Sequence, residues 1–272
     1  MERLKELAKE IRKDILKMTY EKKVGFIGTS FSCADILAVL YGGIVKIDFK
    51  DMDKADNDVV LLSKGHGASA WYATLANVGA FPKERLEREF AESGYAMGVH
   101  PKRKMVPGIE VSSGSLGQGC GLGCGIALAK KLQNSPARVY VLTGDGECNE
   151  GSVWEAMMLA KKFQLDNLTF IIDRNCLQSY GHDEEVLNMG DLAEKVRSFG
   201  FHVLDVDGHN LAELHEAFKE CEQVKGMPTA IIAHTIKGKG CSVFEDKVLW
   251  HYKWPEKEHY EIALKELDGQ ED

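Results

Sequence analysis

The sequence lacks several features that mark whole classes of protein. No apolar stretch approaches the roughly 20 residues that a membrane-spanning helix needs. The N-terminus, Met1-Glu2-Arg3-Leu4-Lys5, is charged and does not contain the apolar core of a signal peptide. Lysine and arginine form no long basic run, and a net charge of −8 makes nucleic acid an unsuitable partner. We therefore expect a cytoplasmic protein that binds neither a membrane nor nucleic acid.

Cysteine does not occur in a disulfide or metal-binding pattern. The seven cysteines are an odd number in apolar and glycine-rich surroundings, which is typical of small core residues in a reducing compartment. Cys120 and Cys124 could supply half of a metal site, but the second half is missing. Cys148 differs only because it lies in the turn described below, where its reaction with a thiol reagent would report on ligand binding.

Short apolar runs alternate with helix-length segments along the chain. The expected strands are 58–63, 138–143, 168–173, 201–205 and 229–235, and the expected helices include 4–16, 33–44 (capped by Ser32), 83–92, 151–163, 192–199 and 211–222. Unalternating apolar strands between helices predict an α/β fold, a parallel sheet with helices on both faces. With 272 residues, 44% hydrophobic, we expect one domain over 1–272, whose charged tail at about 255–272 has a helical tendency.

The most informative pattern lies where two of these strands end. Gly144-Asp145-Gly146-Glu147 follows one strand, and Asn175 follows the next. The segment between them has room for a helix and a crossover back into a parallel sheet. An acid and an amide at the carboxyl ends of neighbouring strands can share one hard cation through oxygen ligands. Such a cation would pin a diphosphate group, although Gly-Asp-Gly alone is an ordinary turn.

A glycine-rich segment precedes the second expected strand. Six glycines lie within residues 112–125, and glycine allows the backbone to approach a ligand closely. Four of them, at positions 117, 119, 121 and 123, alternate in a way that suggests a dinucleotide fingerprint. Their spacing does not suit the tight turn of that motif, and no acidic residue ends a strand about 20 residues later. We therefore reject the dinucleotide interpretation.

Five segments, in order along the chain, resemble motifs of the transketolase family. They are Leu62-Ser63-Lys64-Gly65-His66-Gly67, Val99-His100-Pro101, Ser113-Gly114-Ser115-Leu116-Gly117-Gln118-Gly119, Gly144 through Ala156, and Phe244-Glu245-Asp246-Lys247 with Trp250-His251. The separation of Gly-Asp-Gly from Asn175 also resembles the family's thiamine diphosphate signature. The resemblance covers about Leu4 to Lys253 and corresponds to the family's amino-terminal, diphosphate-binding domain. It implies the thiamine-diphosphate-binding fold.

The resemblance also implies roles for single residues. Asp145 and Asn175 would bind Mg²⁺ or Ca²⁺ by their side chains, and Leu177 would bind it by its carbonyl. His66 would contact the diphosphate end of the cofactor, while His100 and His251 would face the substrate. The other cofactor contacts would be Gly114, Ser115, Leu116, Gly144, Gly146 and Glu147, with Leu116 near the cofactor rings. The remaining histidines, at 182, 202, 209, 215, 234 and 259, are interpreted as surface or structural residues.

Two acids match a functional feature of the family. Glu150, which we expect among the catalytic residues, and Glu155 match positions of a buried acidic chain that links two active sites. Glu155 is equally well explained as an ordinary acid on the face of a helix.

Two positions depart from the family pattern. Phe26, in Gly25-Phe26-Ile27-Gly28, stands where the family has a substrate-facing histidine, and Tyr252 follows His251 where the family usually has glycine. A benzyl group can neither donate nor accept a hydrogen bond, and it cannot relay a proton. We expect cofactor binding to be retained and the preference for donor or acceptor sugars to be altered.

The family's second domain supplies a glutamate to the aminopyrimidine ring of the cofactor, and 272 residues leave no room for it. The resemblance therefore implies a separate C-terminal subunit carrying the pyrimidine-binding domain, in an α2β2 heterotetramer. This assembly would transfer a two-carbon ketol unit from a ketose (phosphate) donor to an aldose acceptor. The alternatives are a synthase of the deoxyxylulose phosphate type, which uses pyruvate, and a non-catalytic scaffold. His66, His100 and His251 favour transketolase, and the intact Asp145 and Asn175 argue against a scaffold.

Overall fold

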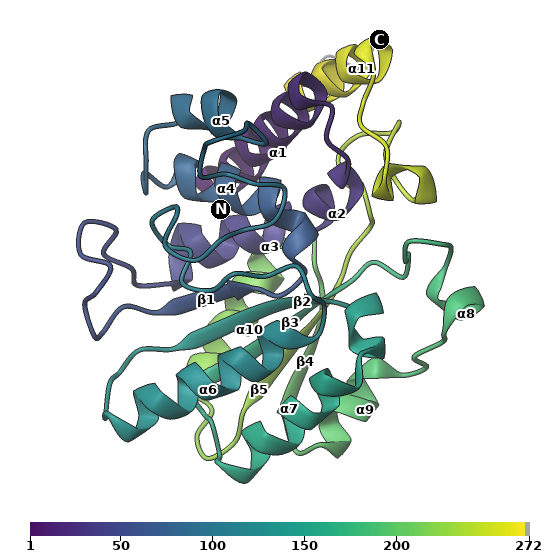
Figure 1. Ribbon diagram of the computed structural model, residues 1–272. Helices are drawn as coiled ribbons and strands as arrows, with labels where there is room; N and C mark the ends of the chain where they lie inside the picture. Colours follow the sequence, from purple (N-terminus) through teal and green to yellow (C-terminus); the bar gives the residue numbers. More distant parts are fainter. Residues whose placement is uncertain (270–272) are drawn as a thin grey trace.

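Five parallel strands form the centre of the structure, a computed structural model that describes residues 1–269 (Figure 1). They are β1 (Val59–Leu62), β2 (Val139–Gly144), β3 (Leu168–Arg174), β4 (His202–Asp207) and β5 (Thr229–His234), in the spatial order β1-β2-β3-β5-β4. The register places Gly144 beside Asp173 and Asp173 beside Ala233, so the carboxyl ends of three neighbouring strands meet. The predicted α/β fold with a parallel sheet is confirmed.

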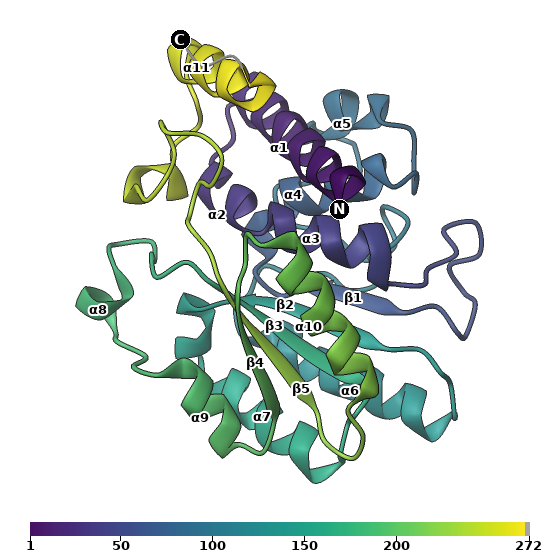
Figure 2. The same ribbon diagram turned by 180° about the vertical axis from the view of Figure 1, so that it is seen from behind.

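Helices cover both faces of this sheet. The α-helices of the described residues are α1 (Glu2–Lys22), α2 (Ile27–Ser32), α3 (Ala34–Val39), α4 (Ala68–Asn77), α5 (Glu84–Glu89), α6 (Gln118–Leu132), α7 (Gly151–Lys162), α8 (Asp183–Val186), α9 (Leu192–Ser198), α10 (Leu211–Gln223) and α11 (Lys257–Asp268), and α5, α8 and α11 lie away from the sheet. Helices α6 and α7 lie over the face seen in Figure 1, and α10 lies over the opposite face, seen in Figure 2.

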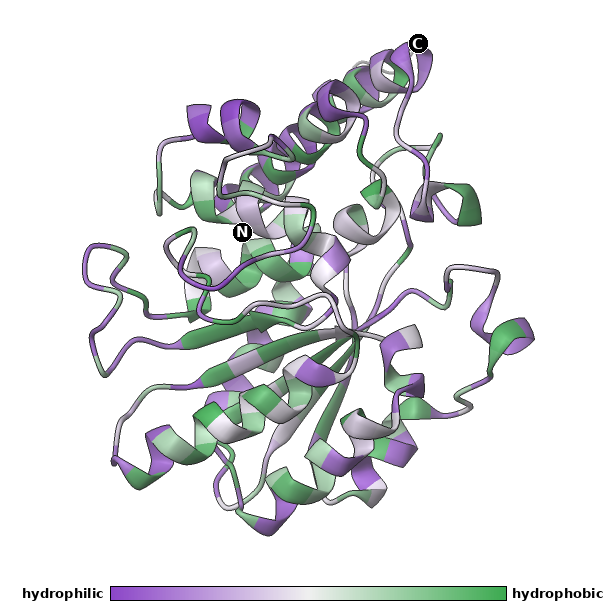
Figure 3. Ribbon diagram, viewed as in Figure 1, coloured by the Kyte–Doolittle hydropathy of each residue, from purple (hydrophilic) through white to green (hydrophobic). Residues whose placement is uncertain are grey.

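Alternate residues of each strand enter two separate hydrophobic cores. In β2, Tyr140 and Leu142 belong to the core under α1, α3, α4 and α10, whereas Val139 and Val141 belong to the core under α6, α7 and α9. Because both faces of β1, β2, β3 and β5 are buried, these four strands are hydrophobic along most of their length (Figure 3), whereas the edge strand β4 is mostly half-buried or exposed. This explains why the sequence shows continuous apolar runs rather than a period of two.

Several boundaries differ from the expected ones. The opening helix continues to Lys22, and the expected helix 33–44 consists of α3 and a π-helical turn at Leu40–Ile44. The expected cap at Ser32 is wrong, because Ser32 lies inside α2 and its hydroxyl donates to the Thr29 carbonyl at 3.0 Å and to Asp173 at 2.6 Å. The charged helix at 83–92 is shorter, spanning only Glu84–Glu89.

The tail forms a helix that packs along the opening helix (Figure 2). Tyr260 of α11 stacks on Tyr20 of α1 with ring centroids 4.4 Å apart, and Ala263 and Leu267 are buried. The helical tendency predicted for the tail is confirmed over α11, while residues 270–272 of that tail lie outside the described residues. Within residues 1–269, no helix combines the length and apolar character that crossing a membrane requires.

Candidate active site

A narrow pocket of about 90 Å³ lies at the carboxyl ends of the strands. Its lining consists of Thr29, Lys64, His66, Leu116, Gly144, Asp145, Gly146, Glu147, Asn175, Leu177, Gln178, Ser179, Lys237 and His251. This end of an open parallel sheet is where ligands bind in such folds. Most of the predicted site residues therefore lie together, and those outside the lining are Gly114, Ser115, His100 and Glu150.

Asp145 and Asn175 lie at adjoining strand ends. Asp145 Oδ2 accepts a hydrogen bond from the Cys176 N–H at 2.6 Å, and Asn175 Oδ1 accepts one from the Leu177 N–H at 3.2 Å. Burial raises the pKa of the Asp145 carboxyl. A buried carboxylate of this kind is stabilised by a nearby cation, because desolvation otherwise disfavours its charged form.

Lys237, which the sequence did not single out, points into the same pocket. Its ammonium donates to the Leu177 carbonyl at 2.5 Å and lies 3.1 Å from His251 Nδ1. Burial, together with repulsion from Lys64, lowers the pKa of Lys237 to about 8. The carbonyl predicted as a metal ligand therefore already contacts a cationic group. A lysine followed by glycine is the one signal in the sequence, and that pair is too common to identify this residue.

Lys64, which belongs to the pocket lining, forms a fully buried ion pair with Asp173. Asp173 also accepts hydrogen bonds from the hydroxyls of Ser32 and Thr235, and Lys64 donates to the Thr29 carbonyl at 3.0 Å. Burial acts to raise the pKa of Asp173, but the Lys64 charge outweighs it and lowers that pKa. Because each member of the pair has further hydrogen-bond partners, the pair can be buried, and it connects the ends of β1 and β3.

Glu147 connects the turn after β2 to the glycine-rich segment. Its carboxylate accepts hydrogen bonds from the hydroxyls of Ser63 and Thr143 and from the N–H groups of Gly117, at 2.8 Å, and Gly144, at 3.1 Å. The carboxylate is therefore engaged by protein donors, although the residue lines the pocket. A direct contact between Glu147 and a cofactor stays a prediction.

Two glycines of the glycine-rich segment are required by their surroundings. Gly117 has a φ of +78°, and a Cβ there would lie 2.4 Å from Ser152 Oγ and 2.7 Å from Glu150 Cβ. Gly114 has a φ of +146°, and a Cβ there would lie 3.0 Å from His100 Cδ2. The segment is thus in close contact with Glu150 and His100, two predicted site residues that do not line the pocket itself.

Phe26 lies among the three predicted site histidines. Its ring centroid is 5.6 Å from that of His66, 6.0 Å from that of His100 and 5.8 Å from that of His251, and each contact is edge-on. Its φ of +71° is left-handed, which costs a bulky residue about 1–2 kcal/mol. Burial lowers the pKa of all three histidines, that of His251 to about 3. The half-exposed ring of Tyr252 lies edge-on to His251 at 4.7 Å.

The pocket has the donors and acceptors that a metal-bound diphosphate requires. Asp145, Asn175 and the Leu177 carbonyl supply oxygen atoms, which hard divalent cations prefer. Among the described residues, Gln178 Nε2 is a buried donor without a hydrogen-bond partner, and it belongs to the pocket lining beside Lys237. Both groups suit phosphate oxygens. The residues present therefore fit this kind of ligand.

A second possible set of ligand atoms shares Asp145. Within the described part of the chain, Asp145, Cys176 and Asp183 bring one ligand atom each within 4.8 Å of one another. Asp183 is already paired with Arg174 at 3.5 Å. The thiol also suits softer metals, whereas oxygen ligands suit Mg²⁺ or Ca²⁺. The all-oxygen set is therefore the better site for a hard cation.

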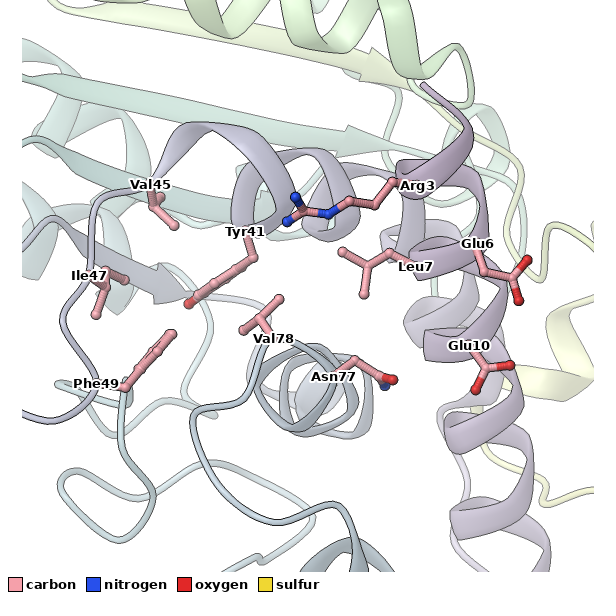
Figure 4. Close-up of a pocket in the computed structure, with 10 residues that line it drawn as sticks. All are labelled: Arg3, Glu6, Leu7, Glu10, Tyr41, Val45, Ile47, Phe49, Asn77 and Val78. Atoms are coloured by element: carbon pink, nitrogen blue, oxygen red, sulfur yellow. The ribbon is translucent and has the colours of Figure 1, made fainter.

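A larger hollow, of about 560 Å³, lies elsewhere on the molecule beside α1 (Figure 4). It is lined by Arg3, Glu6, Leu7, Glu10, Tyr41, Val45, Ile47, Phe49, Asn77 and Val78. None of these is a predicted site residue, and the acids Glu6 and Glu10 lie on one helix without a converging set of ligands. The chemistry is therefore concentrated in the smaller pocket.

Similarity to known proteins shows the family of the chain. Residues 4–253 match the family described as "Transketolase, thiamine diphosphate binding domain". The chain is 37% identical over 256 residues to an apulose-4-phosphate transketolase subunit of Phocaeicola vulgatus, covering 94% of this chain and 90% of that protein. It is 38% identical over 265 residues to the 6-deoxy-6-sulfo-D-fructose transketolase subunit SqwG of a Clostridium species, covering 97% and 96%.

Longer relatives match over part of their length. Human transketolase is 38% identical over 271 residues, which cover 99% of this chain and 43% of that protein. The transketolase structure from Campylobacter jejuni superposes with a TM-score of 0.89 at 28% identity, over 99% of this chain and 43% of that one. Fold and pocket thus define an α/β domain of the thiamine-diphosphate-binding class. The chain belongs to the transketolase family.

Proposed function

We propose that this chain is the amino-terminal subunit of a two-chain transketolase. The enzyme transfers a two-carbon ketol unit from a ketose (phosphate) donor to an aldose acceptor with the help of thiamine diphosphate. The observation that carries the proposal is the convergence of Asp145, Asn175 and the Leu177 carbonyl at adjoining strand ends. The match over nearly the full length of two transketolase subunits supports the two-chain form.

In this proposal the strand ends bind the diphosphate end of the cofactor. Asp145, Asn175 and the Leu177 carbonyl hold Mg²⁺ or Ca²⁺, and Lys237 and Gln178 donate to phosphate oxygens. Further cofactor contacts come from the predicted set of His66, Gly114, Ser115, Leu116, Gly144, Gly146 and Glu147. When bound, thiamine diphosphate supplies the carbon nucleophile and the electron sink for two-carbon transfer.

The histidines form the substrate side of the site. His66, His100 and His251 have lowered pKa values because they are buried, so their rings are uncharged at neutral pH. An uncharged imidazole both donates and accepts hydrogen bonds, which suits sugar hydroxyl groups. Phe26 contacts all three rings and presents an apolar surface where a further imidazole is expected from the resemblance.

A second polypeptide completes the site. The resemblance assigns the glutamate that activates the cofactor to a pyrimidine-binding domain, and this chain covers only 43% of human transketolase. We propose one domain over residues 1–272, a partner chain carrying the pyrimidine-binding domain, and an α2β2 assembly. A cytoplasmic location is part of the proposal and is supported by seven free cysteines.

Helices α6 and α7 provide the contact with a second copy in this assembly. They pack together and expose Leu122, Met158 and Leu159, and a Cβ added at Gly121 or Gly125 would meet no atom within 4 Å. Glu150 and Glu155, the acids that the resemblance places between two active sites, lie at the same α7 end of the molecule and are exposed. Burial of this apolar face against an identical face would also bury the two acids.

The proposal is tested by reconstitution. The isolated chain, a candidate subunit carrying a pyrimidine-binding domain and their mixture are compared for ketol transfer, with a panel of ketose phosphates, deoxy and sulfonated sugars, and pyruvate. We expect turnover only in the mixture, with a sugar donor, and dependent on thiamine diphosphate and a divalent metal. Substantial activity of the isolated chain would refute the two-chain form. Activity with pyruvate as the donor, and none with the sugar donors, would identify a synthase instead of a transketolase. A mixture that binds no cofactor would indicate a scaffold.

A further inference from the structure

A buried cluster of three side chains lies outside the pocket. Arg12 of α1 donates to both carboxylate oxygens of Asp35 in α3, at 3.0 and 2.6 Å. His209, in the loop between β4 and α10, places Nδ1 2.7 Å from Asp35 Oδ2. Arg12 and Asp35 are only 6% and 7% exposed. We call these residues the Arg12–Asp35–His209 triad.

The triad contacts the backbone on both sides of Lys237. The Ile236 N–H donates to His209 Nε2 at 2.8 Å, and Arg12 Nε donates to the Lys239 carbonyl at 2.8 Å. Because a backbone N–H can only donate, His209 Nε2 is the acceptor, and the ring hydrogen is on Nδ1, facing Asp35. Ile236, through His209, and Lys239, through Arg12, are therefore both connected to the buried carboxylate of Asp35.

The segment between these two anchors makes a sharp turn. Gly238 has a φ of +85°, and a Cβ there would lie 2.3 Å from the Phe244 carbonyl oxygen. Its N–H donates to the Gly28 carbonyl at 3.0 Å. This turn directs Lys237 inward to the Leu177 carbonyl and His251. The position of a long, flexible lysine side chain in a buried pocket depends on the position of the backbone that carries it.

We infer that the Arg12–Asp35–His209 triad is a positioning device, which directs Lys237 into the cofactor pocket by holding the backbone at Ile236 and Lys239. The inference rests on the proposed function and adds three residues to it, none of which touches the pocket. A buried ion pair is by itself weak support for stability, since a well-packed apolar cluster of the same volume can stabilise a fold equally well. An apolar cluster could not form the two hydrogen bonds to the backbone at Ile236 and Lys239, whereas the polar triad does.

Two substitutions of His209 separate its two hydrogen bonds. Asparagine places an amide near the position of Nδ1, so His209→Asn keeps the contact with Asp35 and loses the contact with Ile236. Glutamine reaches the position of Nε2, so His209→Gln keeps an acceptor for Ile236. A hollow of about 600 Å³ borders His209 and Asp35, so water can reach the Ile236 amide once its acceptor is removed.

The experiment uses the complete two-chain enzyme and has two readouts. Hydrogen–deuterium exchange of the peptide containing Ile236 is measured without cofactor, and the dissociation constant for thiamine diphosphate with Mg²⁺ is measured by calorimetry. For His209→Asn we expect exchange at Ile236 to become at least several-fold faster and the dissociation constant to rise roughly tenfold, the equivalent of about one charge-assisted hydrogen bond. For His209→Gln, which keeps the acceptor for Ile236 and gives up the bond to Asp35, we expect clearly smaller changes in both values than for His209→Asn.

A matched control and a reserve variant complete the design. His202→Asn, at the other end of β4 and paired with Glu220 at 2.7 Å, is expected to change neither readout. If His209→Asn does not fold, Arg12→Lys is used in its place. Lysine keeps the positive charge beside Asp35, but it cannot also donate a hydrogen bond to the Lys239 carbonyl. For it we expect the same rise in the dissociation constant.

Three results would overturn the inference. The first is an exchange rate at Ile236 in His209→Asn equal to that of the wild type. The second is faster exchange in His209→Asn with an unchanged dissociation constant for thiamine diphosphate. The third is an equal loss of exchange protection and of cofactor affinity in His209→Asn and His209→Gln. A wild-type pair that binds no thiamine diphosphate would instead refute the proposed function. In that case the exchange rates alone decide whether the triad holds this segment.

Discussion

The ammonium of Lys237 lies 2.5 Å from the carbonyl oxygen of Leu177, the atom that we propose as the third ligand of a divalent cation. Two cations at one carbonyl oxygen repel each other strongly in a site with little solvent. If the proposed metal binds this oxygen, the ammonium would have to move away from it, and a diphosphate would provide new acceptors for the ammonium within the same pocket. We therefore expect a phosphate oxygen to replace the Leu177 carbonyl as the acceptor of the Lys237 ammonium in the complex with cofactor and metal.

This relationship predicts the effect of replacing Lys237 by methionine. Lys237→Met keeps most of the side-chain volume and removes the charge, so a charge-assisted hydrogen bond to the cofactor is lost. Such a bond contributes about 1.5–3 kcal/mol, and we expect affinity for thiamine diphosphate to fall by roughly one to two orders of magnitude. Calorimetric titration of the two-chain enzyme measures this. Lys239→Met, which removes only a partly exposed pair with Glu245 at 3.4 Å, is the control. Equal affinities in both variants would contradict the prediction.

Asp145→Asn separates metal binding from folding. Burial raises the pKa of Asp145, which means that its charged form is disfavoured in the folded chain without a metal. The neutral amide should therefore leave the melting temperature in EDTA unchanged or slightly higher. We expect the rise in melting temperature caused by Mg²⁺ and thiamine diphosphate to disappear, because a ligand that no longer binds cannot stabilise the folded state.

Differential scanning calorimetry with and without Mg²⁺ and thiamine diphosphate measures this rise in melting temperature. Asp205→Asn, at an exposed pair with His234 in β4 and β5, is the control and should retain the full ligand-induced rise. If Asp145→Asn retains that rise as well, Asp145 is not a metal ligand.

The sequence predicted the parts of this structure that depend on local patterns. Continuous apolar runs identified the five strands, and the rule that strand ends of a parallel sheet meet brought Asp145 next to Asn175. Contacts between distant segments were not predictable in the same way. Glu147 accepts hydrogen bonds from Ser63 and Gly117, which are 84 and 30 residues away, and no spacing rule connects such positions. Lys237 was missed for the same reason.

The His209 network is a second example of this limit. The sequence predicts a surface or structural residue at His209, and the structure places it outside the lining of the active-site pocket. Its partners Asp35 and Ile236 lie 174 and 27 residues away. Neither stands out in the sequence, because an acid within a helix and an apolar residue after a strand are both common. The function inferred for His209 follows only from the hydrogen bonds that join these positions.

Phe26 is predicted to control substrate preference. Its ring edge contacts three imidazoles whose pKa values are lowered, so it places an apolar surface among polar groups. Phe26→His adds a donor and an acceptor there, and we expect the ratio of kcat/KM values between two sugar substrates to change by roughly 10–200-fold. Cofactor affinity should hardly change, because Phe26 does not line the cofactor pocket.

A substrate panel assayed with the two-chain enzyme measures this ratio. Phe26→Leu is the matched control, because it shortens the side chain without adding a polar atom and should preserve the order of preference. A kcat/KM ratio in Phe26→His equal to that of the wild type would mean that Phe26 is a packing residue.

Asp35 is predicted to make stability depend on pH in acid. Burial acts to raise the pKa of Asp35, but the Arg12 charge and the His209 hydrogen bond outweigh it and hold that pKa at about 2. An unfolded aspartate titrates near pH ~3.9. Because the folded value lies below the unfolded value, the charged carboxylate stabilises the fold. This contribution, about 2–3 kcal/mol, is complete above about pH 4 and is lost as the pH falls towards 2.

Asp35→Asn should therefore lower the free energy of unfolding most at neutral pH. The loss at pH 7 is expected to be about 2–3 kcal/mol or more, since the Arg12 charge also becomes buried without a counter-ion. Urea unfolding of both proteins between pH 7 and pH 3 measures the difference, which should narrow below about pH 4 because the Asp35 carboxylate of the unfolded wild type takes up a proton there and that of the folded wild type does not. Asp53→Asn, whose side chain is 90% exposed, is the control and should leave the free energy nearly unchanged throughout. A difference that stays constant over this range would show that Asp35 contributes through packing alone, because only the charged form of the carboxylate can produce the narrowing.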